Sequence, residues 1–131
     1  MSEDVVFLDL DDLLAASEAF LGRRPQVRDY GLLESALARP QATVFGEDAY
    51  PGIHDKAAAL LSSLVGNHAL LDGNKRLGLV AVRLFYGLND YDFRATDDEK
   101  FDLIMDVAEG RLAEVEKLTE RLVLFASPRL R

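Results

Sequence analysis

The chain has 131 residues, 49% hydrophobic and 29% charged, which is the composition of one globular domain. It contains no cysteine, which excludes disulfide bonds and thiolate nucleophiles or metal ligands. The net charge of −8 argues against direct nucleic-acid binding, which depends on many Lys and Arg side chains. No apolar run reaches about 18 residues, and the start MSEDVVFLDL is acidic where a signal peptide is basic, so we expect a cytoplasmic protein without membrane contact.

The first half of the chain predicts two helices and a loop. Apolar residues at helical spacing predict a helix over residues 8–21 that stops at Gly22. A shorter helix is expected over residues 30–40, ended by Pro40. Residues 44–52, VFGEDAYPG, combine two glycines and a proline, which predicts an exposed loop or small hairpin.

The middle of the chain predicts the two most apolar helices, which we expect at the centre of the fold. A third helix is expected over residues 55–68, and His68 falls on its apolar face. His54 is most simply a surface residue at the start of this helix. A fourth helix is expected over residues 74–88. Its predicted buried stripe comprises Leu77, Val80, Ala81, Leu84 and Phe85.

The last third predicts a turn at residues 89–93 and two more helices. Thr96 or Asp97 can cap the fifth helix, which Gly110 closes, and the tail 127–131 is expected to fray. The apolar residues are Phe101, Ile104, Met105 and Ala108 in the fifth helix and Leu112, Val115, Leu118 and Leu122 in the sixth. Sustained period-2 alternation is absent from the sequence. The prediction is therefore an all-α fold: one compact bundle of about six helices, a single domain over residues 1–131, with a short flap loop before the central helix.

The stretch NHALLDGNKRLG, residues 67–78, indicates a site. Lys75 and Arg76 fall in the first turn of the predicted fourth helix, where the helix dipole already contributes about half a positive charge. Two cations beside this positive helix end repel it, and a bound anion would offset that repulsion. Free backbone N–H groups and two cations together form a phosphate site. Gly73 lets the backbone approach such a ligand, and Asn74 can cap the helix or donate its amide to a phosphate oxygen.

Two further side chains of this stretch fit the same chemistry. Asp72 would repel phosphate unless a cation lies between them, and Mg²⁺ binds through one carboxylate plus phosphate oxygens. His68 lies a few residues upstream and is a candidate general base for a hydroxyl nucleophile. Simpler explanations exist for each residue: a histidine in the core, ordinary helix caps, and cations that face solvent. If all of these simpler explanations held, four unrelated coincidences would have to fall within nine residues.

The segment HALLDGNKR resembles the signature of the Fic/Doc family, H-x-F-x-D/E-G-N followed by G-R or K-R. The resemblance extends over about residues 27–89, including RDYGLLESALARP and YPGIHDKAAALLSSLVGNH. One departure is Leu70, where the family usually has phenylalanine; we expect modest loosening of the loop rather than loss of the site. Lys75 and Leu79 stand where the AMP-transferring branch has glycine and a second arginine, so the chain resembles the Doc branch.

The resemblance implies a toxin of a toxin–antitoxin pair that binds ATP and Mg²⁺ and transfers the γ-phosphate to a threonine hydroxyl of elongation factor Tu, which stops translation. It implies His68 as the base and Asp72 as the Mg²⁺ ligand. The phosphate binders would be Gly73, Asn74, Lys75 and Arg76. The loop carrying Phe45, Tyr50 and Pro51 would be a flap that docks the target peptide, although an ordinary rigid turn explains Tyr50 and Pro51 equally well.

The resemblance also bears on regulation. Many family members inhibit themselves with a helix reading S/T-x-x-x-E-G/N. The nearest segments here are TVFGED, which ends in aspartate, and MDVAEG, which begins with methionine. Neither fits, so we expect inhibition by a separate Phd-type antitoxin whose disordered tail folds as a helix into an apolar groove.

Three other functions are open at this stage. The first is transfer of AMP or UMP to a protein hydroxyl. The second is a degenerate, non-catalytic Fic/Doc regulator. One observation argues against it, namely the joint presence of His68, Asp72, Asn74 and Arg76. The third, a metal-dependent nuclease, is more distant, because one histidine and one aspartate make a thin metal site and the net charge is wrong for nucleic acid.

Overall fold

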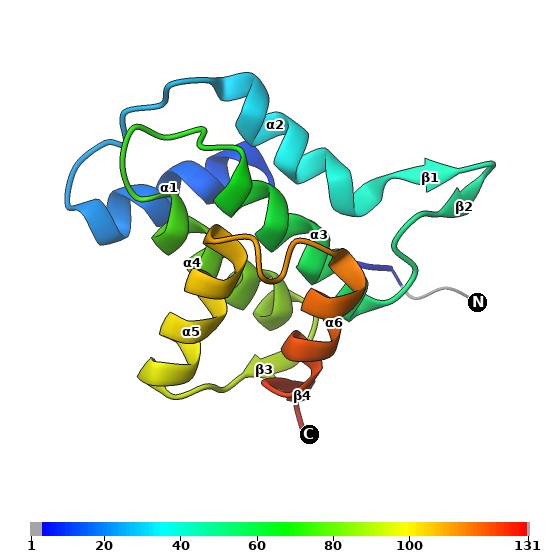
Figure 1. The fold of residues 1–131 in the computed structure, drawn as a ribbon. Helices are drawn as coiled ribbons and strands as arrows, with labels where there is room; N and C mark the ends of the chain where they lie inside the picture. Colours follow the sequence, from blue (N-terminus) through cyan, green and yellow to red (C-terminus); the bar gives the residue numbers. More distant parts are fainter. Residues whose placement is uncertain (1–3, 131) are drawn as a thin grey trace.

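Six α-helices make up most of the described chain, which confirms the predicted all-α fold (Figure 1). The computed structural model describes residues 4–130; residues 1–3, where the acidic start begins, and Arg131 of the predicted tail lie outside that range. The helices are α1 (Leu10–Leu21), α2 (Tyr30–Ala38), α3 (Ile53–Gly66), α4 (Asn74–Leu88), α5 (Asp97–Ala108) and α6 (Val115–Val123). Within residues 4–130, no helix is both long and apolar enough to cross a membrane.

Helices α3 and α4 form the centre of the molecule, as predicted. In Figure 1 they lie between α1 and α2 on one side and α5 and α6 on the other. Ala57 and Leu61 of α3 and Ala81 of α4 are completely buried. A Cβ atom on Gly78 of α4 would lie 2.7 Å from Cγ2 of Val65 in α3, so the two helices approach closely at this glycine. This close contact between α3 and α4 fixes the two ends of the turn that connects them.

Local capping explains where the outer helices begin. Asp9 accepts a hydrogen bond from the backbone N–H of Asp12, and the Asp12 side chain accepts one from the backbone of Asp9. The first helix therefore begins at Leu10 rather than at residue 8. Of the two predicted caps for α5, Thr96 is the cap, and it forms the same reciprocal pair with Glu99.

The predictions for residues 89–93 and for the tail are wrong. Strand β3 (Tyr91–Phe93) pairs antiparallel with strand β4 (Ala126–Pro128), with Asp92 opposite Ser127. Arg129 then donates to the Asp92 carboxylate at 3.1 Å. Strands of three residues are too short to show alternation, and their stability comes from a partner more than thirty residues away.

The predicted buried stripe of α4 is wrong at one position. Leu84 is 42% exposed, because the buried side of α4 centres on Ala81 and Phe85 and leaves Leu84 at its edge. In α5, Leu103 and Ile104 are buried, whereas Phe101 of the same helix is 64% exposed. The periodicity shows that each helix has an apolar face but not how much of that face another element covers.

His54 is half-buried and makes specific contacts, whereas the prediction was a simple surface residue. Its Nδ1 lies 2.8 Å from the hydroxyl of Tyr86, whose side chain is fully buried in α4. The ring also makes an edge contact with Tyr91, at 5.5 Å between centroids. Burial lowers the pKa of His54 and raises the pKa of Tyr86. This histidine joins the start of α3 to the aromatic core.

A small hairpin follows α2 and the short 3-10 turn η1 (Arg39–Gln41), which confirms the predicted flap. Its strands β1 (Thr43–Val44) and β2 (Glu47–Asp48) pair antiparallel and project from the helices in Figure 1. Phe45 and Gly46 form the tip, both with positive φ angles of 52° and 81°. The hairpin leads directly into α3.

Candidate functional site

The turn between α3 and α4 places His68 outside both helices, so the prediction that α3 extends to His68 is wrong. Helix α3 ends at Gly66 and Asn67 is its C-cap. His68 then adopts a left-handed conformation with φ of 52°, which stops the helix and leaves the side chain exposed. This conformation costs a non-glycine residue roughly 1–2 kcal/mol. Strain of this kind concentrates at functional sites.

Residues 26–29, between α1 and α2, hold this turn in place. The guanidinium of Arg28 donates to the main-chain oxygen of His68 and, at 3.4 Å, to that of Asn67. The backbone N–H of Arg28 donates to the oxygen of Ala69 at 2.8 Å, and Val27 pairs with Leu70 in a β-bridge. Arg28 therefore fixes the backbone that carries the candidate base. Arg28 is not among the residues predicted for the site. Its partners are main-chain carbonyl groups, which every residue has, so no residue type in the sequence marks them as partners of an arginine.

The side chain of Asn74 closes the turn from the other end. Its Oδ1 accepts from the backbone N–H of Leu70 and its Nδ2 donates to the oxygen of Leu70, both at 2.9 Å. The N-cap of α4 is Gly73, so Asn74 is not the cap. Leu70 is 2% exposed, so leucine anchors the loop in the core at the position where the family motif has phenylalanine. Asn74 thus fixes the shape of the turn through two hydrogen bonds to the backbone of the buried Leu70.

Gly73 occupies a position that only glycine fits. Its φ of 95° lies in the left-handed region, and a Cβ atom there would lie 3.0 Å from Cε1 of Phe20. Phe20 belongs to α1, and the guanidinium carbon of Arg76 lies 5.2 Å from the centre of its ring. One aromatic side chain therefore packs against the glycine turn and also supports the arginine beside it.

The amino end of α4 is free to bind an anion. The first backbone hydrogen bond of the helix runs from Leu77 to the oxygen of Gly73. Among the described residues, the backbone N–H groups of Asn74, Lys75 and Arg76 have no acceptor within the protein. The side chains of Lys75 and Arg76 are exposed. Unpaired donors, the helix dipole and two cations thus converge on one spot.

A pocket of about 530 Å³ opens at this spot. The turn and α4 form one wall, and α5 forms the other with Met105, Ala108 and Glu109. The six residues predicted for the site all line it: His68, Asp72, Gly73, Asn74, Lys75 and Arg76. The structure therefore brings them together, as the reversing turn predicts, while their chemical roles stay predictions.

Glu109 places a carboxylate in this pocket that the sequence analysis did not assign to the site. Segment 105–110 does not fit the inhibitory motif, because Met105 stands where the motif has serine or threonine. Met105 and Glu109 nevertheless both line the pocket. Arg111 donates to Glu109 at 2.9 Å and to Asp106 at 2.6 Å. The hydrogen bond from Arg111 lowers the pKa of the Asp106 carboxyl. Arg111 partly neutralises the acidic side of a pocket suited to anions.

The three residues predicted to dock a target separate into the tip and the base of the flap. Phe45 is completely exposed at the tip. Tyr50 is half-buried at the base, where Arg39 donates to its hydroxyl at 3.0 Å and lies over its ring. Lys56, only 3% exposed, donates to Asp48 at 3.2 Å and to the main-chain oxygens of Tyr50 and Pro51. Tyr50 and Pro51 therefore contact the base of the flap, and Phe45 is the exposed aromatic side chain at its tip.

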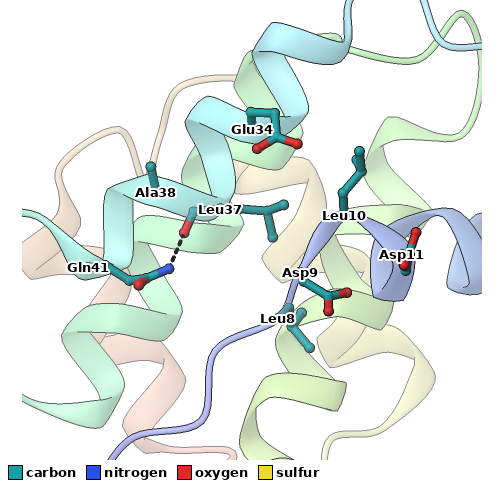
Figure 2. A pocket seen from close by; sticks show the side chains of 8 residues that line it. All are labelled: Leu8, Asp9, Leu10, Asp11, Glu34, Leu37, Ala38 and Gln41. Atoms are coloured by element: carbon teal, nitrogen blue, oxygen red, sulfur yellow. Dashed lines mark hydrogen bonds between the residues drawn. The ribbon is translucent and has the colours of Figure 1, made fainter.

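A second pocket, between the start of α1 and α2, has the opposite character (Figure 2). Its volume is about 440 Å³, and Asp9, Asp11 and Glu34 line it together with Leu8 and Leu37. It has no lysine or arginine in its wall, so it would repel phosphate. Of these two pockets, the one at α4 has the charge that suits an anionic ligand.

Comparison with known proteins agrees with this site. A model of the Fic/DOC family matches residues 7–86, more than half of the chain. The chain belongs to the Fic/DOC family. It is also 44% identical over 122 residues to Toxin Doc of Mycolicibacterium smegmatis, an alignment that covers 92% of this chain and 94% of the relative. Within the family, the chain is therefore of the Doc type.

The Fic/DOC match includes α1 to α3 and all but the last two residues of α4, and so the flap, the turn and the cationic wall of the pocket. The wall formed by Met105 and Glu109 lies beyond the matched residues, on α5 and its C-cap. The matched region thus supplies the unpaired N–H groups and the two cations of the pocket, and the following helix forms its other wall.

The site fits the Mg²⁺ ion that the family resemblance implies. Asp72 is exposed on the pocket wall that also carries the anion-binding groups. Within residues 4–130, no cluster of three or more His, Asp or Glu side chains could hold a metal by itself. A single carboxylate suits Mg²⁺, which takes its other ligands from substrate phosphates and water. Asp72 would therefore hold Mg²⁺ only together with a nucleotide.

Proposed function

We propose that this chain is a Doc-type toxin that transfers the γ-phosphate of ATP to a threonine hydroxyl of elongation factor Tu and so stops translation. The observation that carries the proposal is the convergence of free N–H groups, Lys75 and Arg76 on a pocket that also contains His68. Phosphoryl transfer depends on positioning and charge neutralisation, and this pocket supplies both. The similarity to Toxin Doc supports the same function.

Phosphate binding rests on the amino end of α4. The backbone N–H groups of residues 74–76 donate to the oxygens of the terminal phosphate, and Arg76 binds it through two parallel hydrogen bonds. The ring of Phe20 packs against the guanidinium of Arg76. The arginine side chain is therefore partly ordered before phosphate binds, and it loses less conformational freedom on binding. Because the Asn74 side chain is engaged with Leu70, Asn74 contributes through its backbone and through the shape of the turn.

His68 accepts the proton of the attacking hydroxyl. The threonine oxygen forms a bond to the γ-phosphorus, and the bond from that phosphorus to the β–γ bridging oxygen breaks. ADP leaves with the electron pair, and the hydroxyl proton passes to the imidazole. The left-handed backbone at His68 and the clamp from Arg28 direct the ring from the turn toward the pocket. Mg²⁺ on Asp72 would neutralise charge on the phosphates.

The flap and a separate protein complete the proposed function. Phe45, exposed at the tip, gives the flap an apolar contact for the target peptide, and the buried Lys56 anchors its base. A Phd-type antitoxin neutralises the toxin, in keeping with the relative named Toxin Doc. Elongation factor Tu is the protein substrate, so we place the activity in the cytoplasm.

The test is incubation of the chain with elongation factor Tu, Mg²⁺ and ATP labelled at either the α- or the γ-phosphate. We expect γ-label on a threonine and a mass increase of one phosphoryl group. His68→Ala should abolish the label while ATP binding, measured by calorimetry, stays within about twofold, because the base does not hold the phosphate. Transfer of α-label would show nucleotidyl transfer and overturn the proposal, and so would equal labelling by wild type and His68→Ala.

A further inference from the structure

Two consecutive arginines, Arg23 and Arg24, lie on the connection between α1 and α2, which flanks the turn that carries His68. In Figure 1 this connection runs beside the turn from α3 to α4. Leu71, which lines the phosphate pocket at the amino end of α4, donates its backbone N–H to the main-chain oxygen of Gln26 at 3.0 Å. The arginine pair, Arg23 and Arg24, stands only two residues before Gln26. The pair therefore belongs to the surface that surrounds the site.

The arginine pair has no carboxylate partner within residues 4–130, although carboxylates are in excess. The chain has 23 Asp and Glu residues against 15 Lys and Arg residues. Elsewhere in the described chain, five basic side chains do form ion pairs: Lys56, Arg94, Arg111, Arg121 and Arg129. Arg23 and Arg24 are both exposed, and the Arg23 guanidinium donates at 3.4 Å to the main-chain oxygen of Arg24. Two positive charges thus remain available to a partner beside the site.

Charge is distributed unevenly around the phosphate pocket. On the α4 side, Lys75 and Arg76 likewise have no carboxylate partner within residues 4–130. On the opposite wall, the C-cap of α5 contributes Glu109. The first turn of α5 adds three more carboxylates: Asp97, Asp98 and Glu99. A partner that covers the pocket therefore meets cations on the side of α1 and α4, and carboxylates on the side of α5.

A protein substrate has to cover the surface that carries the arginine pair. His68 is exposed on the turn, so a hydroxyl reaches it only when the surrounding part of the substrate lies over the turn. Even a weak, transient protein contact covers roughly 500 Å² on each partner. That area extends beyond the turn to the segments that flank it. Arginine is also a residue type enriched in such contacts.

We propose that the arginine pair docks an acidic segment of the protein substrate, next to the hydroxyl that is modified. This inference rests on the proposed function and adds a determinant of substrate choice outside the phosphate pocket. The net charge of −8 repels an acidic partner from most of the surface, so this cationic face also orients the encounter. Nucleic acid fits less well, because its continuous phosphates would also cross the carboxylates of Asp72 and Glu109.

The experiment measures steady-state transfer of the γ-label to elongation factor Tu, with KM determined separately for elongation factor Tu and for ATP. The double variant Arg23→Glu/Arg24→Glu should raise KM for elongation factor Tu roughly tenfold, because attraction becomes repulsion. Neither arginine lines the phosphate pocket, so kcat and KM for ATP should not change. Arg23→Lys/Arg24→Lys keeps both charges and should stay within about twofold of wild type, because the effect comes from charge.

A matched control separates the local charge from the net charge. Arg94→Glu/Lys117→Glu makes the same change in net charge at exposed positions, one directly after β3 and one in α6. Neither of these residues lines the phosphate pocket, so this variant should change KM for elongation factor Tu less than about twofold. Ionic strength gives a second measurement. For wild type, kcat/KM for elongation factor Tu should fall as NaCl is added, and for Arg23→Glu/Arg24→Glu it should stay level or rise.

The outcomes separate this inference from the function on which it rests. If wild type transfers no label to elongation factor Tu, the proposed function is wrong and this inference falls with it. If wild type transfers label and Arg23→Glu/Arg24→Glu has the same KM for elongation factor Tu, only this inference is wrong. An equal rise in KM for the control variant would also overturn it, because net charge would then explain the effect. So would an equal rise in KM for ATP, which would assign the arginines to the nucleotide.

Discussion

At the scale of single residues, the site depends on backbone conformations that side chains alone do not reveal. His68 has a left-handed backbone and Gly73 has a φ of 95°. From its sequence, Gly73 is expected to let the backbone approach a ligand, with no prediction of its φ angle. At His68 the spacing continues the apolar stripe of α3, so nothing in the sequence predicts a left-handed backbone there. A sequence pattern thus indicated the residues that line the candidate site, while the conformation that exposes the imidazole is visible only in the structure.

Replacing Gly73 with alanine tests this backbone requirement. Gly73→Ala should lower the free energy of unfolding by roughly 1–2 kcal/mol, because alanine disfavours this φ and its Cβ would crowd Phe20. Urea denaturation measures the change. Gly66→Ala is the matched control: it lies in the last turn of α3 with nothing within 4 Å, and alanine there should be neutral or stabilising. Equal stability of Gly73→Ala and wild type would contradict the account.

At the scale of elements, two sets of contacts hold the turn at His68 and the flap in place: one comes from the segment between α1 and α2, and the other from Lys56 of α3. Residues 26–29 hold the turn that carries His68, and Lys56 holds the base of the flap. Periodicity predicted the six helices because each has a persistent apolar face. It could not predict these contacts, since the partners of Arg28 and Lys56 are largely main-chain oxygens. The short pair β3 and β4 escaped prediction for a related reason, because a partner distant in sequence stabilises it.

Arg28 is a positioning residue, and its removal should affect catalysis more than binding. We expect Arg28→Ala to lower kcat about tenfold, a cost of about 1.4 kcal/mol, while KM for ATP changes little. The reason is that the guanidinium holds the main chain of His68 but does not line the phosphate pocket. Steady-state labelling of elongation factor Tu gives both constants.

Two further variants make that measurement decisive. Arg24→Ala removes an exposed arginine from the same connecting segment and should leave kcat unchanged. Arg28→Lys should recover only part of the activity, because an ammonium lacks the planar fork of a guanidinium. A rise in KM with an unchanged kcat for Arg28→Ala would show that Arg28 serves nucleotide binding instead.

At the scale of the whole molecule, the partly buried contact between His54 and Tyr86 makes stability depend on pH. Burial lowers the pKa of His54 below its ordinary value of 6.5, and the nearby Asp55 opposes this only in part. The folded protein therefore binds fewer protons than the unfolded chain when the pH falls below about 6.5. Stability conferred by neutral His54 is present above that pH and is lost as the pH falls toward the lowered folded-state pKa.

A variant that keeps the hydrogen bond without titrating tests this dependence. His54→Gln can still donate to the hydroxyl of Tyr86, so between about pH 7 and pH 5 its unfolding free energy should fall less steeply than that of wild type. The carboxylates titrate in both proteins, so their contribution cancels in the comparison. Thermal melts across this range provide the measurement, and identical slopes would show that His54 does not titrate on folding.

The most direct test of the central claim is a crystal structure of His68→Ala with ATP and Mg²⁺, since this variant should bind nucleotide without turning it over. The account predicts the γ-phosphate on the N–H groups of residues 74–76, beside position 68. A nucleotide in the reverse direction, or a phosphate bound away from the amino end of α4, would contradict it.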